Sequence, residues 1–197
     1  YKRQTLSVDW EHIPAKHRSL IKAFLDEADM SADAIKTVDF PPAYGADIVV
    51  SCEKAKDPKN GSIYLKPTQF VLGIGCRRDT AFENIDRAIR QSLLKLQIDI
   101  SDIDMIASID VKKDEPGIKE FCDRNRIDFV TYTADELMAV QGEFSASQFV
   151  REHVGVDNVC ERAAVLACSR ECNEAGELVY KKHKYDRVTV AAARYPD

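Results

Sequence analysis

The chain has 197 residues, 45% of them hydrophobic, and its 28 lysines and arginines against 33 aspartates and glutamates give a formal net charge of −5. This length fits one domain with or without a smaller segment, and a charged fraction of 31% is typical of a folded globular protein. The acidic balance excludes a broad basic surface for nucleic acid, and no apolar run approaches the roughly 18 residues of a membrane helix. The chain begins with Tyr1 and shows no signal-peptide pattern, so we expect a cytoplasmic protein that is a piece of a longer one.

The cysteines and histidines form no metal-binding pattern. The closest cysteine spacing is Cys168-x-x-x-Cys172, whereas zinc sites usually show tighter pairs. His12 and His17 are five residues apart, which does not suit one helical face. Because no secretory signal is present, we predict reduced, structural cysteines and no metal site.

The first third of the chain predicts one helix and two short strands. Pro14 opens a stretch with apolar residues at helical spacing, namely Leu20, Ile21, Phe24, Leu25 and Ala28. The prolines within 40–45 then interrupt regular structure. Ile48–Val50 and Ile63–Leu65 are strand candidates, and the Asn-Gly pair within 57–61 predicts a hairpin between them.

From Phe70 onward, strands and helices alternate. Phe70–Ile74 reads as a buried strand, and Thr80 with Glu83 predicts a capping box for the next helix. That helix carries an apolar stripe of Phe82, Ile85, Ile89, Leu93 and Leu96. Met105–Ile109 is the second predicted strand, and Asp114 with Pro116 predicts the start of a second helix.

The last third continues this alternation and ends in a hairpin. Phe129–Tyr132 predicts a third strand, and Thr133 with Glu136 predicts a second capping box. A helical piece is expected around 149–154, and Asp157 is the expected cap of a helix through Ala167. The closing hairpin would pair Leu178–Tyr180 with Val188–Ala192.

This order of elements predicts an α/β fold. We expect a three-layer domain with a mostly parallel or mixed central sheet at 67–197, preceded by a small α+β segment at 1–66.

The loop after the first of these strands is the most informative stretch. It reads Gly73-Ile74-Gly75-Cys76-Arg77-Arg78 and lies where α/β sheets bind ligands, beyond the carboxyl end of a strand. Glycines allow close backbone approach, and arginines suit carboxylate or phosphate. A dinucleotide fingerprint would need glycine at Arg78, and a P-loop would need Gly-Lys-Ser/Thr. The loop is therefore either an anion site of another kind or a tight turn with solvated arginines.

The stretch Leu72–Thr80 resembles the opening of the C-terminal domain of the CbiG family, the cobalt-precorrin-5A hydrolases of anaerobic cobalamin biosynthesis, a domain shared with CobE proteins. Asp79 stands where many members have glycine. Further matching blocks follow in order at Ala107–Gly117, at Gly155–Ala164, and at Lys181–Lys184 with Val188–Ala191.

The resemblance implies an enzyme that opens the ring-A lactone of cobalt-precorrin-5A and releases acetaldehyde. It implies no resident cofactor, because the cobalt arrives inside the tetrapyrrole substrate. The expected partners are that substrate, other enzymes of the pathway, and the family's N-terminal domain acting in cis. The alternatives are a non-catalytic corrinoid carrier of the CobE type and, less favoured, a nucleotide-binding sensor that uses the glycine loop.

The reaction requires a polyanion to be held, water to be activated and an oxyanion to be stabilised. For binding we nominate Gly73, Gly75, Arg77, Arg78, Lys112, Lys182 and Lys184. Asp110 is the expected general base, with Asp79, Glu83 and Glu115 as rivals. Cys76 is a candidate nucleophile, since a helix N-terminus and two arginines would lower its pKa. The N–H groups of Gly75 and Cys76 are the expected oxyanion hole, and His183 is expected to be a solvated loop residue.

Overall fold

The computed structural model describes residues 6–8, 10, 13–14, 17–19, 21–23, 35–36, 48–50, 63–65, 68–146, 152, 155–172 and 175–196. The chain divides into two compact units, the first covering 1–68 and the second covering Gln69–Pro196.

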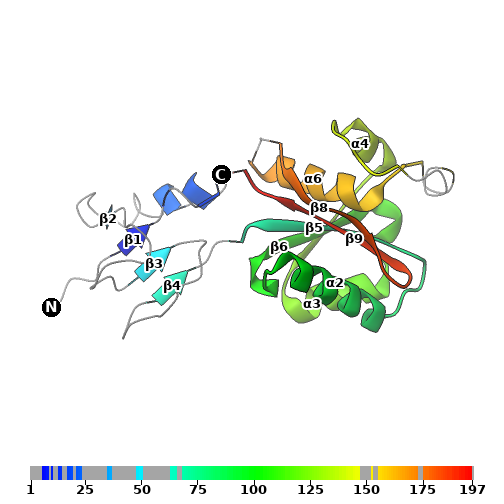
Figure 1. The fold of residues 1–197 in the computed structure, drawn as a ribbon, viewed down its shortest axis with the longest axis horizontal. Coiled ribbons are helices and arrows are strands. Elements are labelled where there is room, and N and C mark those ends of the chain that lie inside the picture. Colours follow the sequence, from blue (N-terminus) through cyan, green and yellow to red (C-terminus); the bar gives the residue numbers. More distant parts are fainter. Residues whose placement is uncertain are drawn as a thin grey trace. The chain divides into compact units, whose positions relative to one another are not determined.

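The first unit contains a parallel sheet with the strand order β2-β1-β3-β4 (Figure 1). Its strands are β1 (Leu6–Val8), β2 (Ile35–Lys36), β3 (Ile48–Val50) and β4 (Ile63–Leu65). The predicted strands at β3 and β4 are present, but the predicted hairpin is wrong, because the two strands pair in parallel. Parallel neighbours need a crossover of about a dozen residues, and 51–62 supply that length.

The predicted helix after Pro14 is described in part. The Pro14 carbonyl accepts hydrogen bonds from the N–H groups of His17 and Arg18, and residues 17–19 and 21–23 are helical. Several earlier expectations lie outside the described residues: the apolar positions Leu20, Phe24, Leu25 and Ala28, the proline segment 40–45, the turn at 57–61, and most of the helical piece at 149–154.

The second unit is built on a five-stranded mixed sheet with the strand order β7-β6-β5-β9-β8. The strands are β5 (Phe70–Cys76), β6 (Ile103–Ile109), β7 (Asp128–Tyr132), β8 (Glu177–Lys184) and β9 (Val188–Arg194). Strands β5, β6 and β7 are parallel, while β9 runs antiparallel to both β5 and β8. The predicted closing hairpin and mixed sheet are therefore confirmed.

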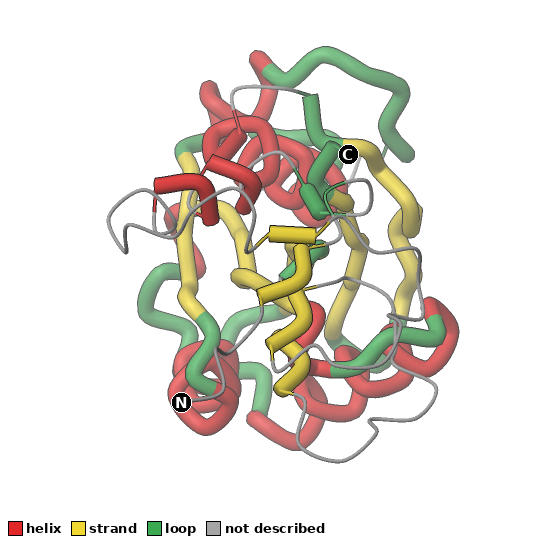
Figure 2. Tube along the Cα trace, turned by 90° about the vertical axis from the view of Figure 1, so that its left-hand side faces the viewer, coloured by secondary structure: helices red, strands yellow, loops and turns green. Residues whose placement is uncertain are grey.

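Helices cover both faces of this sheet. The α-helices are α2 (Phe82–Leu96), α3 (Pro116–Asn125), α4 (Ala134–Ala139) and α6 (Val159–Cys172), and short 3-10 turns η2 (Ile100–Asp102) and η3 (Asp110–Lys112) flank β6. Helices α2 and α3 lie on one face, and α4 and α6 on the other (Figures 1 and 2). The predicted three-layer α/β arrangement is confirmed.

The residues of β5 alternate between two cores, as expected for a strand covered on both faces. Leu72 and Ile74 pack in the core under α2 and α3, whereas Val71 packs in the core under α6. Because both faces are covered, this central strand is almost entirely apolar. Its last two residues, Gly75 and Cys76, are half-buried at the carboxyl end of the strand.

The capping predictions have different outcomes. The Thr133–Glu136 capping box is present. The Thr80–Glu83 box is wrong, because Ala81 is the N-cap of α2 and the Thr80 hydroxyl donates instead to the Arg77 carbonyl. At α6, Asn158 rather than Asp157 is the cap, since its Oδ1 accepts the N–H of Glu161 at 3.0 Å.

Candidate functional site

The carboxyl ends of β5 and β6 meet the β8–β9 hairpin at one edge of the second unit. Strand β5 ends at Cys76, and β9, which runs antiparallel to it, begins at Val188 directly opposite. Strand β6 ends at Ile109 on the other side of β5. Three segments therefore converge, and we refer to them together as the carboxyl edge: residues 77–81, 110–115 and 185–187.

The first of these segments is fixed by backbone contacts with the hairpin. The N–H of Arg77 donates to the Arg187 carbonyl at 3.0 Å, and Nη2 of Arg187 donates to the Arg78 carbonyl at 2.8 Å. Asp79 has a φ of 54°, in the left-handed region that favours glycine. The predicted Arg77 and Arg78 lie here with exposed side chains, beside an exposed arginine, Arg187, that the sequence analysis did not nominate.

Glu115 joins the first segment to the second. Its Oε1 accepts the N–H of Thr80 at 2.9 Å, and its Oε2 accepts Nζ of Lys112 at 2.8 Å. Burial by itself would raise the pKa of Glu115, but the hydrogen bonds from Lys112 and Thr80 outweigh it and lower the pKa below 4.5. The predicted substrate ligand Lys112 is therefore bound to a carboxylate of the protein, and its side chain is only 13% exposed.

The N-terminus of α3 approaches this segment closely. A Cβ at Gly117 would overlap the Thr80 carbonyl, so only glycine allows the helix to pack there. The rival base Glu115 thus serves as a clamp between two loops, and the rival Glu83 lies in the first turn of α2.

Asp110 begins η3 immediately after β6 and is half-buried. Its carbonyl accepts the N–H of Lys113 at 3.0 Å, which fixes the backbone at this point. The structure thus places the predicted general base on the carboxyl edge, in the segment next to the one that carries Arg77 and Arg78.

Cys76 is partly buried against the core under α2 and α3. Burial raises the pKa of the Cys76 thiol to about 11, and the positive charges of Lys112 and Arg187 only partly oppose this rise. The direction is opposite to the depression that the sequence analysis expected. Desolvation wins because Cys76 is the last residue of a covered strand and is not an exposed loop residue.

The two glycines of β5 have different surroundings. A Cβ at Gly73 would overlap the backbone carbonyl of Cys160, so this glycine allows α6 to pack directly on the sheet. A Cβ at Gly75 would lie 2.7 Å from Oγ1 of Thr189, a side chain that can rotate. Gly73 is buried, while Gly75 lies at the half-exposed end of the strand.

The register decides where the expected oxyanion donors point. N–H groups alternate in direction along an antiparallel strand. Because the N–H of Arg77 is bonded to the carbonyl of Arg187 on the hairpin, the N–H of Gly75 also faces β9. The N–H of Cys76 faces the other way, toward β6, where the β5–β6 ladder has already ended at Gly73. Of the two predicted donors, only Cys76 is directed away from β9.

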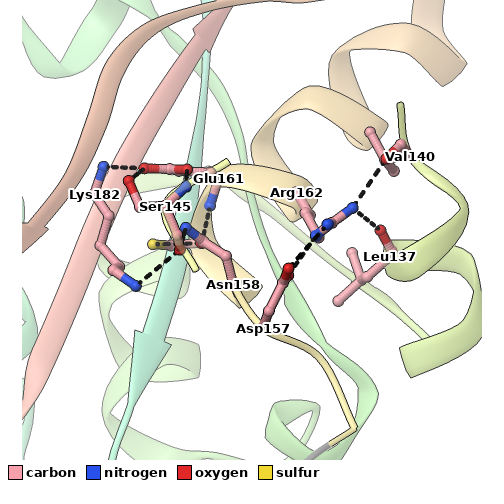
Figure 3. Close-up of polar contacts among 9 residues, drawn as sticks. Leu137, Val140, Ser145, Asp157, Asn158, Glu161, Arg162 and Lys182 are labelled. Carbon is pink, nitrogen blue, oxygen red and sulfur yellow. Dashed lines mark hydrogen bonds and ion pairs between the residues drawn. The ribbon is translucent and has the colours of Figure 1, made fainter. Parts of the chain in front are cut away.

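A buried polar network surrounds the N-terminus of α6 (Figure 3). Glu161 is fully buried, and its carboxylate accepts the N–H of Ser145 at 2.7 Å, the Ser145 hydroxyl at 2.8 Å and the N–H of Lys182 at 2.6 Å. Asn158 donates to the Ser145 carbonyl at 2.8 Å while capping the helix. The network ties the segment around Ser145 to strand β8, and so fixes the backbone from which Lys182 projects.

The next residue of the helix, Arg162, extends the network to α4. Its guanidinium pairs with both carboxylate oxygens of Asp157, at 2.7 and 3.2 Å, and donates to the carbonyls of Leu137 and Val140 (Figure 3). Sequence reasoning missed this pair of residues. The signal was available, since Glu161 and Arg162 interrupt a helix that otherwise consists largely of alanine, valine and cysteine, and charged residues at such positions need internal partners.

The remaining predicted cations lie on β8. Nζ of Lys182 donates to the Ser145 carbonyl at 3.3 Å, whereas Lys184 is exposed at the end of the strand. His183 stacks on Tyr180, with 4.0 Å between the ring centroids, and its Nδ1 lies 2.8 Å from the Lys181 carbonyl. The prediction of a solvated loop histidine is therefore wrong, because His183 is part of strand β8.

Cys76, Cys122, Cys160, Cys168 and Cys172 are free thiols, and Cys52 lies outside the described part. Within the described ranges, no three His, Cys, Asp or Glu side chains are grouped so that they could hold a metal ion. None of the helices described here is long and apolar enough to cross a membrane.

Residues 70–193 match the protein family described as "Cobalamin synthesis G C-terminus". The chain belongs to this family. It is 38% identical over 102 residues to "Cobalt-precorrin-5A hydrolase" of Salmonella typhimurium, covering 52% of this chain and 29% of that protein. It is 31% identical over 137 residues to "Probable cobalt-precorrin-5A hydrolase" of Methanocaldococcus jannaschii, covering 67% and 42%. The chain thus spans less than half the length of these hydrolases.

Two solved structures of cobalamin biosynthesis proteins share the fold. CobE, "a protein from the cobalamin (vitamin B12) biosynthetic pathway", matches with a TM-score of 0.60 and 26% identity, over 64% of this chain and 89% of that one. Cobalamin biosynthesis protein chiG of Agrobacterium tumefaciens matches with a TM-score of 0.51 and 28% identity, over 65% and 99%. The family resemblance inferred from the four sequence blocks is confirmed.

Proposed function

We propose that this chain is the C-terminal part of a cobalt-precorrin-5A hydrolase of anaerobic cobalamin biosynthesis. The reaction would open the ring-A lactone of the cobalt-containing macrocycle and release acetaldehyde. Two relatives at 31–38% identity carry the hydrolase name. The observation that carries the proposal is the carboxyl edge, where exposed Arg77 and Arg78 lie next to the segment that begins with half-buried Asp110.

Recognition of the substrate would be electrostatic and local. The macrocycle bears many carboxylates, and guanidinium groups bind carboxylates through paired hydrogen bonds. The net charge of −5 does not oppose this, because the arginines and Lys184 concentrate positive charge at one edge of the second unit. Lys112 would act indirectly, because it is paired with Glu115.

The chemical step would be addition of water to the lactone carbonyl, followed by carbon–carbon cleavage that frees acetaldehyde. We assign Asp110 as the base that accepts the proton of the attacking water. The N–H of Cys76 would stabilise the oxyanion. We assign no covalent step to the Cys76 thiol, because a pKa of about 11 keeps it protonated at neutral pH. The cobalt would enter within the substrate, and the reaction would take place in the cytoplasm.

The test is acetaldehyde release from cobalt-precorrin-5A, coupled to NADH oxidation by alcohol dehydrogenase. The full-length gene product and this 197-residue chain are assayed side by side, so that a requirement for the family's N-terminal domain is measured directly. Asp110→Asn should lower kcat by about 10²- to 10⁴-fold with little change in corrinoid affinity. Asp114→Asn is the matched control, since Asp114 is an exposed acid of the same segment that pairs with Lys119 at 3.7 Å.

Substrate affinity is measured separately by absorbance titration. Arg77→Ala or Arg78→Ala should weaken it by about tenfold, the value of one charge-assisted hydrogen-bonding contact. Unchanged affinity in both variants would show that Arg77 and Arg78 do not bind the substrate. A parental kcat in Asp110→Asn would show that Asp110 is not the general base.

A non-catalytic corrinoid carrier is the second candidate, and one observation favours it. The match covers 89% of the CobE chain but only 29–42% of the two hydrolases. A protein made largely of this second unit therefore exists in the same pathway. Tight corrinoid binding by the full-length protein without acetaldehyde release would establish the carrier in place of the hydrolase.

A further inference from the structure

We propose that Arg187, in the β8–β9 hairpin, is a third arginine of the binding site and holds a carboxylate of the macrocycle together with Arg77 and Arg78. The identity of the ligand rests on the proposed function, but the geometry of the arginine cluster does not.

Contacts between the hairpin and the loop after β5 create the cluster. The Arg187 carbonyl accepts the N–H of Arg77, and its Nη2 donates to the carbonyl of Arg78. A guanidinium carries five N–H donors in a fixed fork. The contact with Arg78 occupies one nitrogen, so the group is oriented by the protein while further donors remain for a ligand.

In the described part of the protein, none of the three arginines forms an ion pair, and all three side chains are exposed. Two acids lie beside them in the sequence, Asp79 and Asp186, and both are exposed. Asp186 accepts Nδ2 of Asn84 at 3.1 Å, and Glu115 binds Thr80 and Lys112. The three guanidinium groups therefore remain available to a ligand.

The charge of Arg187 also reaches the end of β5. Arg187 and Lys112 both act on the Cys76 thiol and lower its pKa against the effect of burial. Exposed arginines on two adjoining segments favour an anionic ligand with several carboxylates.

The backbone at Arg187 decides which substitution is informative. Its φ of 62° lies in the left-handed region, where glycine is the residue with no steric cost. Glycine at this position therefore removes the guanidinium without adding backbone strain.

Arg187→Gly removes the guanidinium while placing the residue that this backbone conformation prefers. Asp79→Gly is the matched control, because Asp79 has a φ of 54° on the same edge and carries no positive charge. Arg187→Lys keeps the positive charge but lacks the paired N–H donors of the guanidinium. The probes are cobalt-precorrin-5A and uroporphyrin, a stable tetrapyrrole with eight carboxylates, titrated by absorbance without turnover.

For Arg187→Gly we expect a thermal midpoint within about 3 °C of the parent value and a Kd for uroporphyrin raised about tenfold. Arg187→Lys should raise the Kd by about threefold, and Asp79→Gly should bind as tightly as the parent or more tightly. The proposal is overturned if Arg187→Gly binds with parental affinity, or if Asp79→Gly weakens binding as much as Arg187→Gly does. It is also overturned if the parent binds neither probe. Failure of acetaldehyde release with these affinities intact would overturn the hydrolase and leave the arginine site standing.

Discussion

Replacement of the buried Glu161 should be among the most destabilising single changes in the second unit. Its carboxylate accepts three hydrogen bonds, from two groups of Ser145 and the N–H of Lys182, at 2.6–2.8 Å and without solvent exposure. A hydrogen bond to a charged group contributes about 1.5–3 kcal/mol. Since half-buried Ser145 can partly turn to water when the carboxylate is lost, we expect Glu161→Ala to lower the free energy of unfolding by about 3–5 kcal/mol.

Glu161→Gln should cost less, about 1–3 kcal/mol, because one amide oxygen still accepts. The assay is urea unfolding followed by circular dichroism, where the midpoint should fall with an unchanged slope. In Glu161→Ala, hydrogen exchange of the Ser145 and Lys182 amides should accelerate, since both lose their acceptor.

Glu143→Gln is the control for this experiment. Glu143 is an exposed acid in the same segment as Ser145, so removal of the same charge there should change the free energy of unfolding by about 0.5 kcal/mol or less. A loss below about 1 kcal/mol for Glu161→Ala would refute the reasoning, because it would mean that the network contributes little beyond solvation of its members.

Three further predictions concern strand β5 and the carboxyl edge. Gly73→Ala should lower the free energy of unfolding by about 2–4 kcal/mol, because the backbone of α6 must move. Gly75→Ala displaces one side chain and should lower it by about 1 kcal/mol. Equal thermal midpoints for the two variants would contradict this difference. Cys76, with a pKa of about 11, should be alkylated more slowly than free cysteine at pH 8, as measured by peptide mass spectrometry, and faster labelling would overturn the burial argument. Glu115 has a lowered pKa, so its contribution to stability is present above pH 4.5 and is lost as the pH falls through its folded-state pKa. In Glu115→Gln, the free energy of unfolding measured with urea should therefore fall less steeply with decreasing pH. The same decrease in the variant and the parent would count against this assignment.

Local sequence patterns were sufficient to predict most elements of the second unit and their order. Apolar periodicity predicted β5, α2, β6, α3 and β7 because the signal for each lies within one short stretch. The Thr133–Glu136 capping box was predictable for the same reason, since its partners are three residues apart. The family was also readable from local blocks, and with it the position of Arg77 and Arg78 beyond the end of a strand.

Tertiary structure decided which groups meet. The N–H of Thr80, which the predicted capping box assigned to Glu83, donates instead to Glu115, 35 residues further along. Arg187 reaches the Arg78 carbonyl across 109 residues, and Lys182 reaches Glu161 across 21. The direction of the Cys76 pKa shift depends on the layers that cover β5, and no local pattern contains them. Periodicity is a property of neighbouring residues, whereas hydrogen-bond partners, burial and clustered charge arise only when distant segments pack together.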